Sequence, residues 1–305
     1  MIEARGLTKH YGDKLAVDQL SFSVDPGVVT GFLGPNGAGK STTMRMIMGL
    51  DSPSAGDVTV NGRHYRDLEW PLREVGALLE AKAIHPGRSA RAHLKMLAET
   101  NAIKRARVEE MLSVVGLTEV AEKRAGKFSL GMGQRLGIAA ALLGDPEVLL
   151  FDEPVNGLDP DGIRWVRNLL KGLAKEGRTV FVSSHLMSEM ALTADRVVII
   201  GKGRLIAELG VEELLSQSSA RFVRVRSPET DKLQAALESG GAHTVLEDDG
   251  SLSVRQMSEE EIGERALSIG VALHELAPKS ASLEEAFMEL TEDSLEYHGT
   301  GGGHS

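Results

Sequence analysis

Apolar and polar residues follow one another in short, regular patterns through the first two hundred residues of the chain. Alternating patterns predict two strands at 2–7 and 15–24 that pair as an antiparallel edge. Uninterrupted apolar runs predict buried strands at 28–33, 148–151 and 179–183. Further strands are expected at 57–62, at 73–80, where the run ends in Glu80, and in a hairpin formed by 196–200 and 204–207.

Segments with helical periodicity lie between these strands. Residues 42–48 and 163–175 predict helices, the second of them amphipathic. Residues 91–100 and 105–115 are helical and rich in charge, without strand signals, which indicates a helical insertion over about 86–138. Residues 128–134 are expected to form a glycine-bearing turn, with Ser129 capping a helix over 135–143. Strands that alternate with helices predict an α/β fold with a mainly parallel sheet covered by helices.

The pattern changes after a serine-rich stretch at 216–219, a candidate linker. Strands are expected at 221–225, 251–255 and 271–276, and helices at 231–238, 259–269 and 283–291. These elements predict a small α+β domain over 220–296, separate from a first domain over 1–215. Residues 297–305, rich in glycine, are expected to form a flexible tail.

Composition narrows the class of protein. A length of 305 residues suits about two domains, and 42% apolar with 26% charged residues is ordinary for a soluble globular protein. No apolar run approaches the ~18 residues of a membrane span, and the N-terminus lacks the apolar core of a signal peptide. The absence of cysteine excludes disulfides and thiolate zinc sites, and the nine histidines show no tight metal-ligand spacing. We therefore expect a cytoplasmic protein.

Charge is unevenly distributed along the chain. The 17 acidic and 7 basic residues from position 221 onward account for the whole net charge of −10, and the charges before it cancel. An acidic C-terminal unit is the simplest explanation, and it argues against a nucleic-acid partner at that surface.

The strongest chemical signal is a phosphate-binding pattern, G-x-x-x-x-G-K-[ST], between the buried strand at 28–33 and the helix at 42–48. Its glycines let backbone N–H groups surround phosphates, and the helix start adds a positive dipole end. A glycine-rich turn with a surface lysine is the alternative, but it does not explain why lysine and serine follow the second glycine. The residues are Gly34, Pro35, Asn36, Gly37, Ala38, Gly39, Lys40, Ser41 and Thr42. Lys40 would reach the β- and γ-phosphates of a nucleotide, and Ser41 would bind Mg²⁺.

A second signal is the pair of carboxylates, Asp152 and Glu153, that follows the strand at 148–151. The first can hold Mg²⁺ or its water, and the second can orient an attacking water. Two acids at a strand edge, stopped by a proline, remain the structural alternative. His185 follows the strand at 179–183, and its place at a strand end favours a site role over that of a surface histidine. Tyr11 could stack on a flat base or pack at a strand end.

Taken together, residues 1 to about 215 resemble the ATP-binding subunit of an ABC transporter. Residues 34–42 match the Walker A motif, 148–153 match Walker B, and 128–132 occupy the place of the signature L-S-G-G-Q. Tyr11 matches the adenine-stacking aromatic, residues 156–159 match the D-loop, and His185 matches the switch histidine. The spacing of these motifs and the acidic C-terminal unit resemble the bacterial ABC-2-type exporter ATPases, a branch that includes drug- and antibiotic-resistance exporters.

The resemblance implies a P-loop NTPase cassette that hydrolyses ATP with Mg²⁺ to drive export. It implies that two cassettes, here a homodimer, close head to tail. Ser129, Gly131 and the D-loop residue Asp159 of one cassette would then lie near the ATP bound to the other cassette. It also implies a separate ABC-2-type permease that would hold the chain at the inner face of the cell membrane. Glutamine of the Q-loop is replaced by Glu80, which would still offer an oxygen to the metal.

The signature departs from the family at Leu130, where a glycine is usual, and at Met132, where a glutamine is usual. These departures keep a second hypothesis open, a nucleotide-sensing module with little turnover. A third is a soluble ABC protein acting on ribosomes or DNA. Such relatives usually carry two cassettes or a long coiled coil, whereas this sequence has one Walker A motif and about 90 residues between Lys40 and Ser129.

Overall fold

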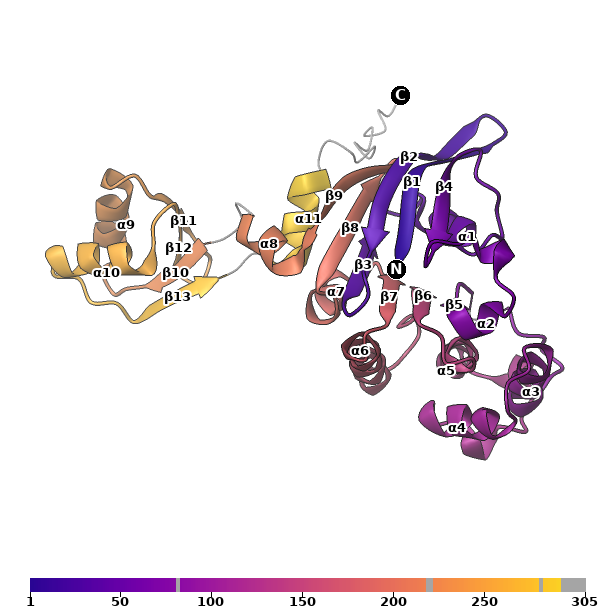
Figure 1. Cartoon of the computed structure of the whole chain (residues 1–305). Coiled ribbons are helices and arrows are strands. Elements are labelled where there is room, and N and C mark those ends of the chain that lie inside the picture. The colour runs from indigo at the N-terminus through magenta and orange to yellow at the C-terminus, as the bar shows by residue number, and fades with distance from the viewer. Residues whose placement is uncertain (81–82, 218–221, 280–281, 292–305) are drawn as a thin grey trace, which may run out of the picture. The chain divides into compact units, whose positions relative to one another are not determined.

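The protein is described here by a computed structural model, which covers residues 1–80, 83–217, 222–279 and 282–291. The chain forms two compact units, Met1–Val211 and Glu212–Leu290. Figure 1 shows the first in indigo to salmon and the second in orange to yellow. The first unit contains two sheets and the second contains one, and each unit has its own buried core.

A six-stranded sheet in the order β5-β6-β7-β3-β8-β9 forms the frame of the first unit. Neighbouring strands are parallel except β8 and β9, which form an antiparallel hairpin. The predicted mainly parallel sheet is therefore confirmed. The strands are β3 Val29–Leu33, β5 Val75–Leu78, β6 Val148–Asp152, β7 Thr179–Ser183, β8 Arg196–Gly201 and β9 Arg204–Gly210.

The N-terminal strands form a second, antiparallel sheet rather than an edge of the first. Its order is β2-β1-β4, with β1 Ile2–Tyr11, β2 Lys14–Val24 and β4 Ala55–Val60. Helix α1, Lys40–Ile47, buries Met44, Met46 and Ile47 in the core cluster that both sheets share. The sequence pattern shows that these strands pair with each other but does not indicate this separation, because alternation marks only a half-buried strand.

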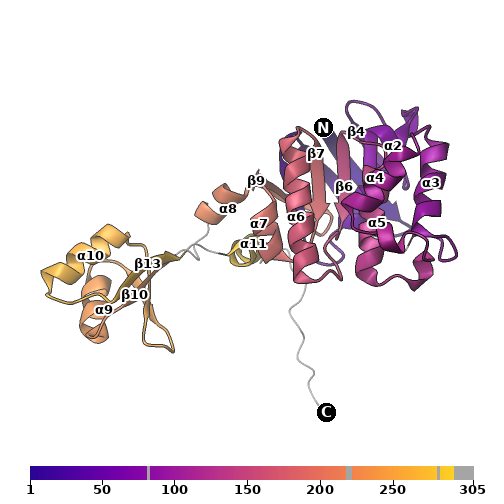
Figure 2. The ribbon, with the colours of Figure 1, turned by 90° about the horizontal axis from the view of Figure 1, so that it is seen from below.

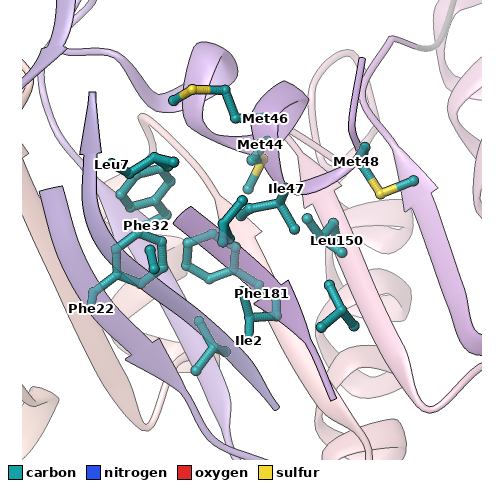
Figure 3. Packing of buried hydrophobic residues seen from close by; sticks show 14 of the residues in the cluster. Ile2, Leu7, Phe22, Phe32, Met44, Met46, Ile47, Met48, Leu150 and Phe181 are labelled. Atoms are coloured by element: carbon teal, nitrogen blue, oxygen red, sulfur yellow. The ribbon is translucent and has the colours of Figure 1, made fainter. Parts of the chain in front are cut away.

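Three phenylalanine rings fill the centre of this core (Figure 3). The ring centroid of Phe181 lies 5.6 Å from that of Phe22 and 4.9 Å from that of Phe32. The three side chains come from β7, β2 and β3. The aromatic cluster thus connects the antiparallel sheet to the strands that carry the candidate site.

Helices cover the other face of the parallel sheet. Helix α6 packs on β7 and β3, and α5 packs on β5 (Figure 2). Methionine Met190 of α7 lies against Gly31 of β3, where a Cβ atom would be only 2.8 Å from its sulfur. The helices are α2 Pro71–Glu74, α3 Ala90–Thr100, α4 Ala106–Val114, α5 Leu130–Leu142, α6 Pro160–Lys175 and α7 Met187–Thr193. Short 3₁₀ turns occupy Tyr65–Asp67, Thr118–Val120 and Ala125–Lys127.

Two local expectations for this unit are wrong. The strand expected over 73–80 is limited to Val75–Leu78, because Pro71 begins the short helix α2 just before it. The turn expected over 128–134 is helical from Leu130, because the hydroxyl of Ser129 accepts a hydrogen bond from the N–H of Met132 at 3.2 Å and caps the helix early.

The second unit contains a four-stranded antiparallel sheet in the order β11-β12-β10-β13. Helices α9 and α10 pack on it, and their leucine and isoleucine side chains join the valines of β10 and β12 in one core. The elements are α8 Val211–Gln217, β10 Phe222–Arg226, α9 Thr230–Ser239, β11 His243–Leu246, β12 Leu252–Arg255, α10 Glu259–Ser268, β13 Glu275–Lys279 and α11 Leu283–Thr291.

Some expectations for this unit also need correction. The strand expected over 271–276 lies instead at Glu275–Lys279 and contains Pro278, which is tolerated because β13 is an edge strand. The expected linker begins inside α8, which continues through Gln217, and residues 218–219 lie outside the described part of the chain. The whole expected tail, 297–305, and both ends of the domain expected over 220–296 also lie outside the described residues.

We predict that Phe181→Ala lowers the free energy of unfolding of the first unit by about 3–5 kcal/mol, the usual cost of removing a buried aromatic side chain. Urea denaturation followed by tryptophan fluorescence measures this unit, because both tryptophans, Trp70 and Trp165, lie in it. The control is Leu192→Ala, at a position on α7 that is 52% exposed, which should change stability by under ~0.5 kcal/mol. Equal midpoints for the two variants would contradict the central role of the aromatic cluster.

Candidate functional site

The site lies at the carboxyl edge of the parallel sheet, where β3, β6 and β7 end together. In the strand register, Ser183 of β7 is opposite both Asp152 of β6 and Phe32 of β3. The segments that follow these three strands therefore start side by side. They are residues 34–39, 153–159 and 184–186, which carry Asn36, Glu153, Asp159 and His185 of the residues expected from the sequence.

The loop at 34–39 connects β3 to α1 and has the backbone shape of a phosphate cradle. Gly39 has φ +106°, and a Cβ atom there would lie 2.7 Å from the carbonyl oxygen of Ala16, so the position requires glycine. No side chain caps α1 at Gly39. The first N–H groups of the helix can therefore serve a bound anion, which the helix dipole also favours.

Lys40 is a buried cation at the start of α1, only 8% exposed. Its Nζ atom donates to the carbonyl oxygens of Gly34 at 2.5 Å and Pro35 at 3.2 Å. Burial lowers the pKa of the Lys40 ammonium, while the charges of Glu153 and Asp152 oppose this shift. Among the described residues no carboxylate forms an ion pair with it, and its hydrogen bonds go to backbone carbonyl oxygens.

Asp152 connects the phosphate loop to the neighbouring strand. Its Oδ2 accepts a hydrogen bond from the Ser41 hydroxyl at 2.7 Å, and its Oδ1 accepts one from Ser183. Two hydroxyl donors hold the carboxylate in one orientation. The Ser41 and Asp152 oxygens lie together on the side of the loop that faces the cavity.

Glu153 and His185 form a hydrogen bond at the same edge. Nδ1 of His185 lies 2.7 Å from Oε2 of Glu153. An ionised carboxylate can only accept hydrogen bonds, so Nδ1 carries the hydrogen that is shared between the two groups. The pairing directs the carboxylate of Glu153 along the edge of the sheet, and the backbone of Glu153 has φ +52°, which is unusual for a residue with a side chain.

Tyr11 stands at the end of β1 with its ring held from two sides. Its hydroxyl donates to Oδ2 of Asp51 at 2.7 Å, and Asp51 also accepts from Nε of Arg45 at 2.8 Å. The hydrogen bonds from Arg45 and Tyr11 lower the pKa of Asp51, and the bond to Asp51 raises the pKa of Tyr11. Nζ of Lys9 lies 5.0 Å from the ring centroid, so it covers one face of the ring.

These groups surround one open cavity of about 410 Å³, large enough for a nucleotide. The structure brings together there the two carboxylates, most of the phosphate loop and the tyrosine expected from the sequence. The lining residues are Tyr11, Lys14, Ala16, Asn36, Gly37, Gly39, Lys40, Ser41, Thr42, Leu79, Asp152 and Glu153. His185 reaches the cavity through its contact with Glu153.

The signature residues lie outside this cavity. Ser129 caps α5, and the side chain of Leu130 lies against Gly157, where a Cβ atom would be 2.3 Å from it. The leucine that replaces a glycine thus has space at the helix start and packs on the D-loop of the same chain. Asp159 caps α6 by accepting from the N–H of Gly162 at 2.9 Å, and Gly131 lies close to the same loop.

Glu80 is exposed and lies two residues beyond β5, so the expected strand end at this position is wrong. Leu79 lines the cavity, but Glu80 does not. Within the described part of the chain, its carboxylate has no hydrogen-bond or ion-pair partner. Its expected role toward a metal therefore remains a prediction.

Sequence reasoning did not identify Ser183, Gln134 and Asp51. Ser183 could have been found from its place at the end of β7, in register with Asp152. Gln134 stands in an apolar helix and is buried, and its side-chain amide contacts Glu153. Asp51 has no sequence signal, because its contact with Tyr11 joins residues 40 positions apart.

A larger cavity of about 610 Å³ lies in the second unit, lined by Phe222, Met257, Pro278 and neighbouring residues. It contains neither a phosphate loop nor a pair of carboxylates, so the chemistry favours the smaller cavity. Within the described ranges, no cluster of three or more histidine or acidic side chains could hold a metal by itself. The described helices include none with the length and apolar character needed to span a membrane.

Comparison with known proteins agrees with this geometry. The ABC transporter family profile matches residues 17–156, and a domain of unknown function matches 221–284. An uncharacterized ABC transporter ATP-binding protein, YhcH of Bacillus subtilis, is 36% identical over 302 residues and covers 97% of each chain. The bacitracin transport ATP-binding protein BcrA of Bacillus licheniformis is 40% identical over 241 residues, 78% of each chain.

A solved structure shows the same architecture. A dimeric ATP-binding cassette in a post-hydrolysis state, bound to ADP and phosphate, superposes with a TM-score of 0.64. It is 25% identical and covers 69% of this chain and 99% of its own. Since the motifs, the fold and a relative matched over nearly its whole length agree, the chain belongs to the ABC transporter family as an ATP-binding and ATP-hydrolysing subunit.

Proposed function

We propose that this chain powers export through a separate ABC-2-type permease, with Glu153 as the residue that activates water. The observation that carries the proposal is the pair of carboxylates at the end of β6, which line one cavity together with Lys40 and Ser41. Ser41 and Ser183 fix the first carboxylate, which leaves the second for chemistry.

Hydrolysis needs a water aligned with the γ-phosphate and a group that accepts its proton. The Glu153 carboxylate supplies the acceptor at the cavity wall, and His185 steadies it from the opposite side. Lys40 offers the phosphates a desolvated charge, whose attraction is stronger than that of a solvated surface lysine. Backbone N–H groups of the loop and of the first turn of α1 complete the phosphate contacts.

The donor set at the cavity fits Mg²⁺, which prefers oxygen ligands and uses few of them from the protein. The Ser41 hydroxyl and the Asp152 carboxylate lie 2.7 Å apart and face the cavity together. They would hold the ion beside the phosphates of ATP, where it would neutralise charge that develops during transfer. Glu80, exposed beside Leu79, is a further oxygen donor that we propose for this ion.

The chain is proposed to act as a homodimer in which each signature completes the site of the partner. Ser129, Gly131 and Asp159 lie away from the cavity of their own chain, which is the arrangement a head-to-tail dimer needs. The matched ATP-binding cassette is itself dimeric, which supports this assembly. Through the permease the subunit would lie at the inner face of the membrane, and the bacitracin transporter relative suggests a drug or antibiotic as cargo.

We propose that residues 220–296 form an accessory domain that takes no part in ATP chemistry. Its described part has a core of its own and carries none of the cassette motifs. The balance of 17 acidic to 7 basic residues from position 221 onward separates it electrostatically from residues 1–220, whose charges cancel. A role in stabilising the dimer or regulating turnover suits such a domain.

We predict that Glu153→Gln abolishes ATP turnover while ATP binding persists and an ATP-bound dimer accumulates. The amide keeps the shape of the side chain but cannot accept the proton. Phosphate release and size-exclusion chromatography with ATP measure the two effects.

The control is Glu147→Gln, next to the opposite end of β6, and it should leave turnover unchanged. Turnover near the wild-type rate in Glu153→Gln would remove this residue from the role. A wild-type protein without turnover would favour a nucleotide-sensing module.

Lys40→Ala should weaken ATP binding about tenfold to a hundredfold, because a charge-assisted contact is worth ~1.5–3 kcal/mol. Equilibrium titration with a fluorescent ATP analogue measures the change. Lys171→Ala on the exposed face of α6 is the matched control for loss of one positive charge. Equal dissociation constants for the two variants would place the phosphates elsewhere.

Asp51→Ala should weaken ATP binding about threefold to tenfold and leave the affinity for inorganic tripolyphosphate unchanged. The carboxylate fixes the Tyr11 ring, and stacking on a base is worth ~1–3 kcal/mol when the platform is in place. Competition titrations with both ligands separate base from phosphate contacts, and Asp67→Ala on an exposed turn serves as control. Equal losses for both ligands would show that Asp51 acts on the loop and not on the base.

A further inference from the structure

Gln134 is a polar side chain buried in the apolar helix α5, with an exposed fraction of 4%. Its Nε2 donates to the backbone carbonyl of Glu153 at 3.1 Å. Since a carbonyl oxygen only accepts, the amide must present its NH₂ group there. Its Oε1 is buried and, among the described residues, lacks a hydrogen-bond partner. An unpaired buried amide oxygen opposes folding, so stability alone does not explain a glutamine at this position.

The carbonyl that Gln134 holds belongs to a residue in a rare backbone conformation. Glu153 has φ +52°, a value that is unfavourable for a residue with a Cβ atom and persists only where the surroundings fix it. Its N–H donates to the carbonyl and to the hydroxyl of Ser183 at 3.2 and 3.1 Å. Its carbonyl accepts from the N–H of Asn156 at 3.2 Å as well as from Gln134. Three elements therefore hold one residue.

This conformation decides where the carboxylate of Glu153 points. An extended residue would continue β6, whose successive side chains alternate between the faces of the sheet. The left-handed turn instead brings Oε2 to within 2.7 Å of Nδ1 of His185 and places Glu153 in the wall of the cavity. A contact that fixes the turn thus also fixes the carboxylate.

We propose that Gln134 is a positioning residue for ATP hydrolysis. Its amide holds the carbonyl of Glu153 and so keeps the water-activating carboxylate aimed into the cavity. The proposal rests on the role of Glu153 given above. Gln134 lies five residues after Ser129, about 7.5 Å along the helix. A shift of α5 against β6 therefore acts directly on the turn at Glu153.

The test begins with Gln134→Met, which keeps the length of the side chain and removes the donor. The variant also removes the unpaired Oε1, and the Glu153 carbonyl keeps its bond from Asn156, so the urea midpoint should not fall. We expect kcat to fall about tenfold to a hundredfold, the scale of a misplaced catalytic group, with the Kd for ATP within about twofold of wild type. Hydrogen exchange of the Asn156 amide should become faster.

The matched control is Thr30→Val on β3. It removes another buried polar atom that has no partner among the described residues, and it makes no contact with Glu153. Its kcat should equal that of the wild type. A Gln134→Met variant with wild-type kcat and wild-type Asn156 exchange would overturn the proposal. A lower kcat would also overturn it if ATP affinity fell by the same factor, or if the urea midpoint fell as well, because the variant would then have lost binding or stability.

Gln134→Glu gives a second test, because pH can switch the hydrogen-bond donor on and off in a single variant. A protonated carboxyl can donate to the Glu153 carbonyl and an ionised one cannot, and burial raises the pKa of the introduced group. The ratio of the kcat of Gln134→Glu to the kcat of the wild type should therefore rise as pH is lowered. The same ratio for Gln134→Met should stay constant. Parallel profiles for the two variants would contradict the hydrogen bond as the cause.

The outcomes separate this proposal from the proposed function. If Glu153→Gln retains turnover, the role of Glu153 is wrong, while the Asn156 exchange rate in Gln134→Met still reports whether Gln134 holds the turn. If Glu153→Gln is inactive and Gln134→Met is fully active with unchanged exchange, the proposed function stands and the positioning role does not.

Discussion

The register of the parallel strands β3, β6 and β7 is the constraint on which the candidate site depends. It sets Asp152 beside Ser183 and brings the phosphate loop alongside both. Because side chains alternate along a strand, a slip of one residue in β6 would turn Asp152 to the other face of the sheet. Phe32 of β3 and Phe181 of β7 pack against each other and against Phe22, and this packing opposes a slip of β3 against β7.

Burial at the sheet edge explains why so few groups form the site. Lys40 is desolvated and bonded only to carbonyl oxygens among the described residues, and a buried charge of this kind favours an anionic ligand. Asp152 is already satisfied by two hydroxyls. Glu153 is the other carboxylate at the cavity wall, and among the described residues His185 is the side chain that hydrogen-bonds to it. Packing has thus separated two adjacent acids, one fixed by two hydroxyls and one that lines the cavity beside His185.

Backbone geometry at Glu153 and at Gly39 contributes as much as side-chain chemistry. Both residues have positive φ. Gly39 must be a glycine because of a nearby carbonyl oxygen, and it shapes the phosphate loop. Glu153 is held in this conformation by hydrogen bonds, which set the direction of its carboxylate. Strain at Glu153 costs ~1–3 kcal/mol, a cost that the contacts of Ser183, Gln134 and Asn156 together can offset.

The sequence by itself determined most strands of the first unit, the phosphate loop and the identity of the two carboxylates, because these depend on local periodicity and on residues adjacent in the chain. It could not determine the separate antiparallel sheet, the early start of α5 at Leu130, or the displaced strand β13, since these follow from capping and from packing between distant segments. Contacts of Gln134 with Glu153 and of Tyr11 with Asp51 join residues 19 and 40 positions apart. Only the tertiary structure brings such pairs within hydrogen-bond distance, so only it decided how Glu153 and the ring of Tyr11 are held.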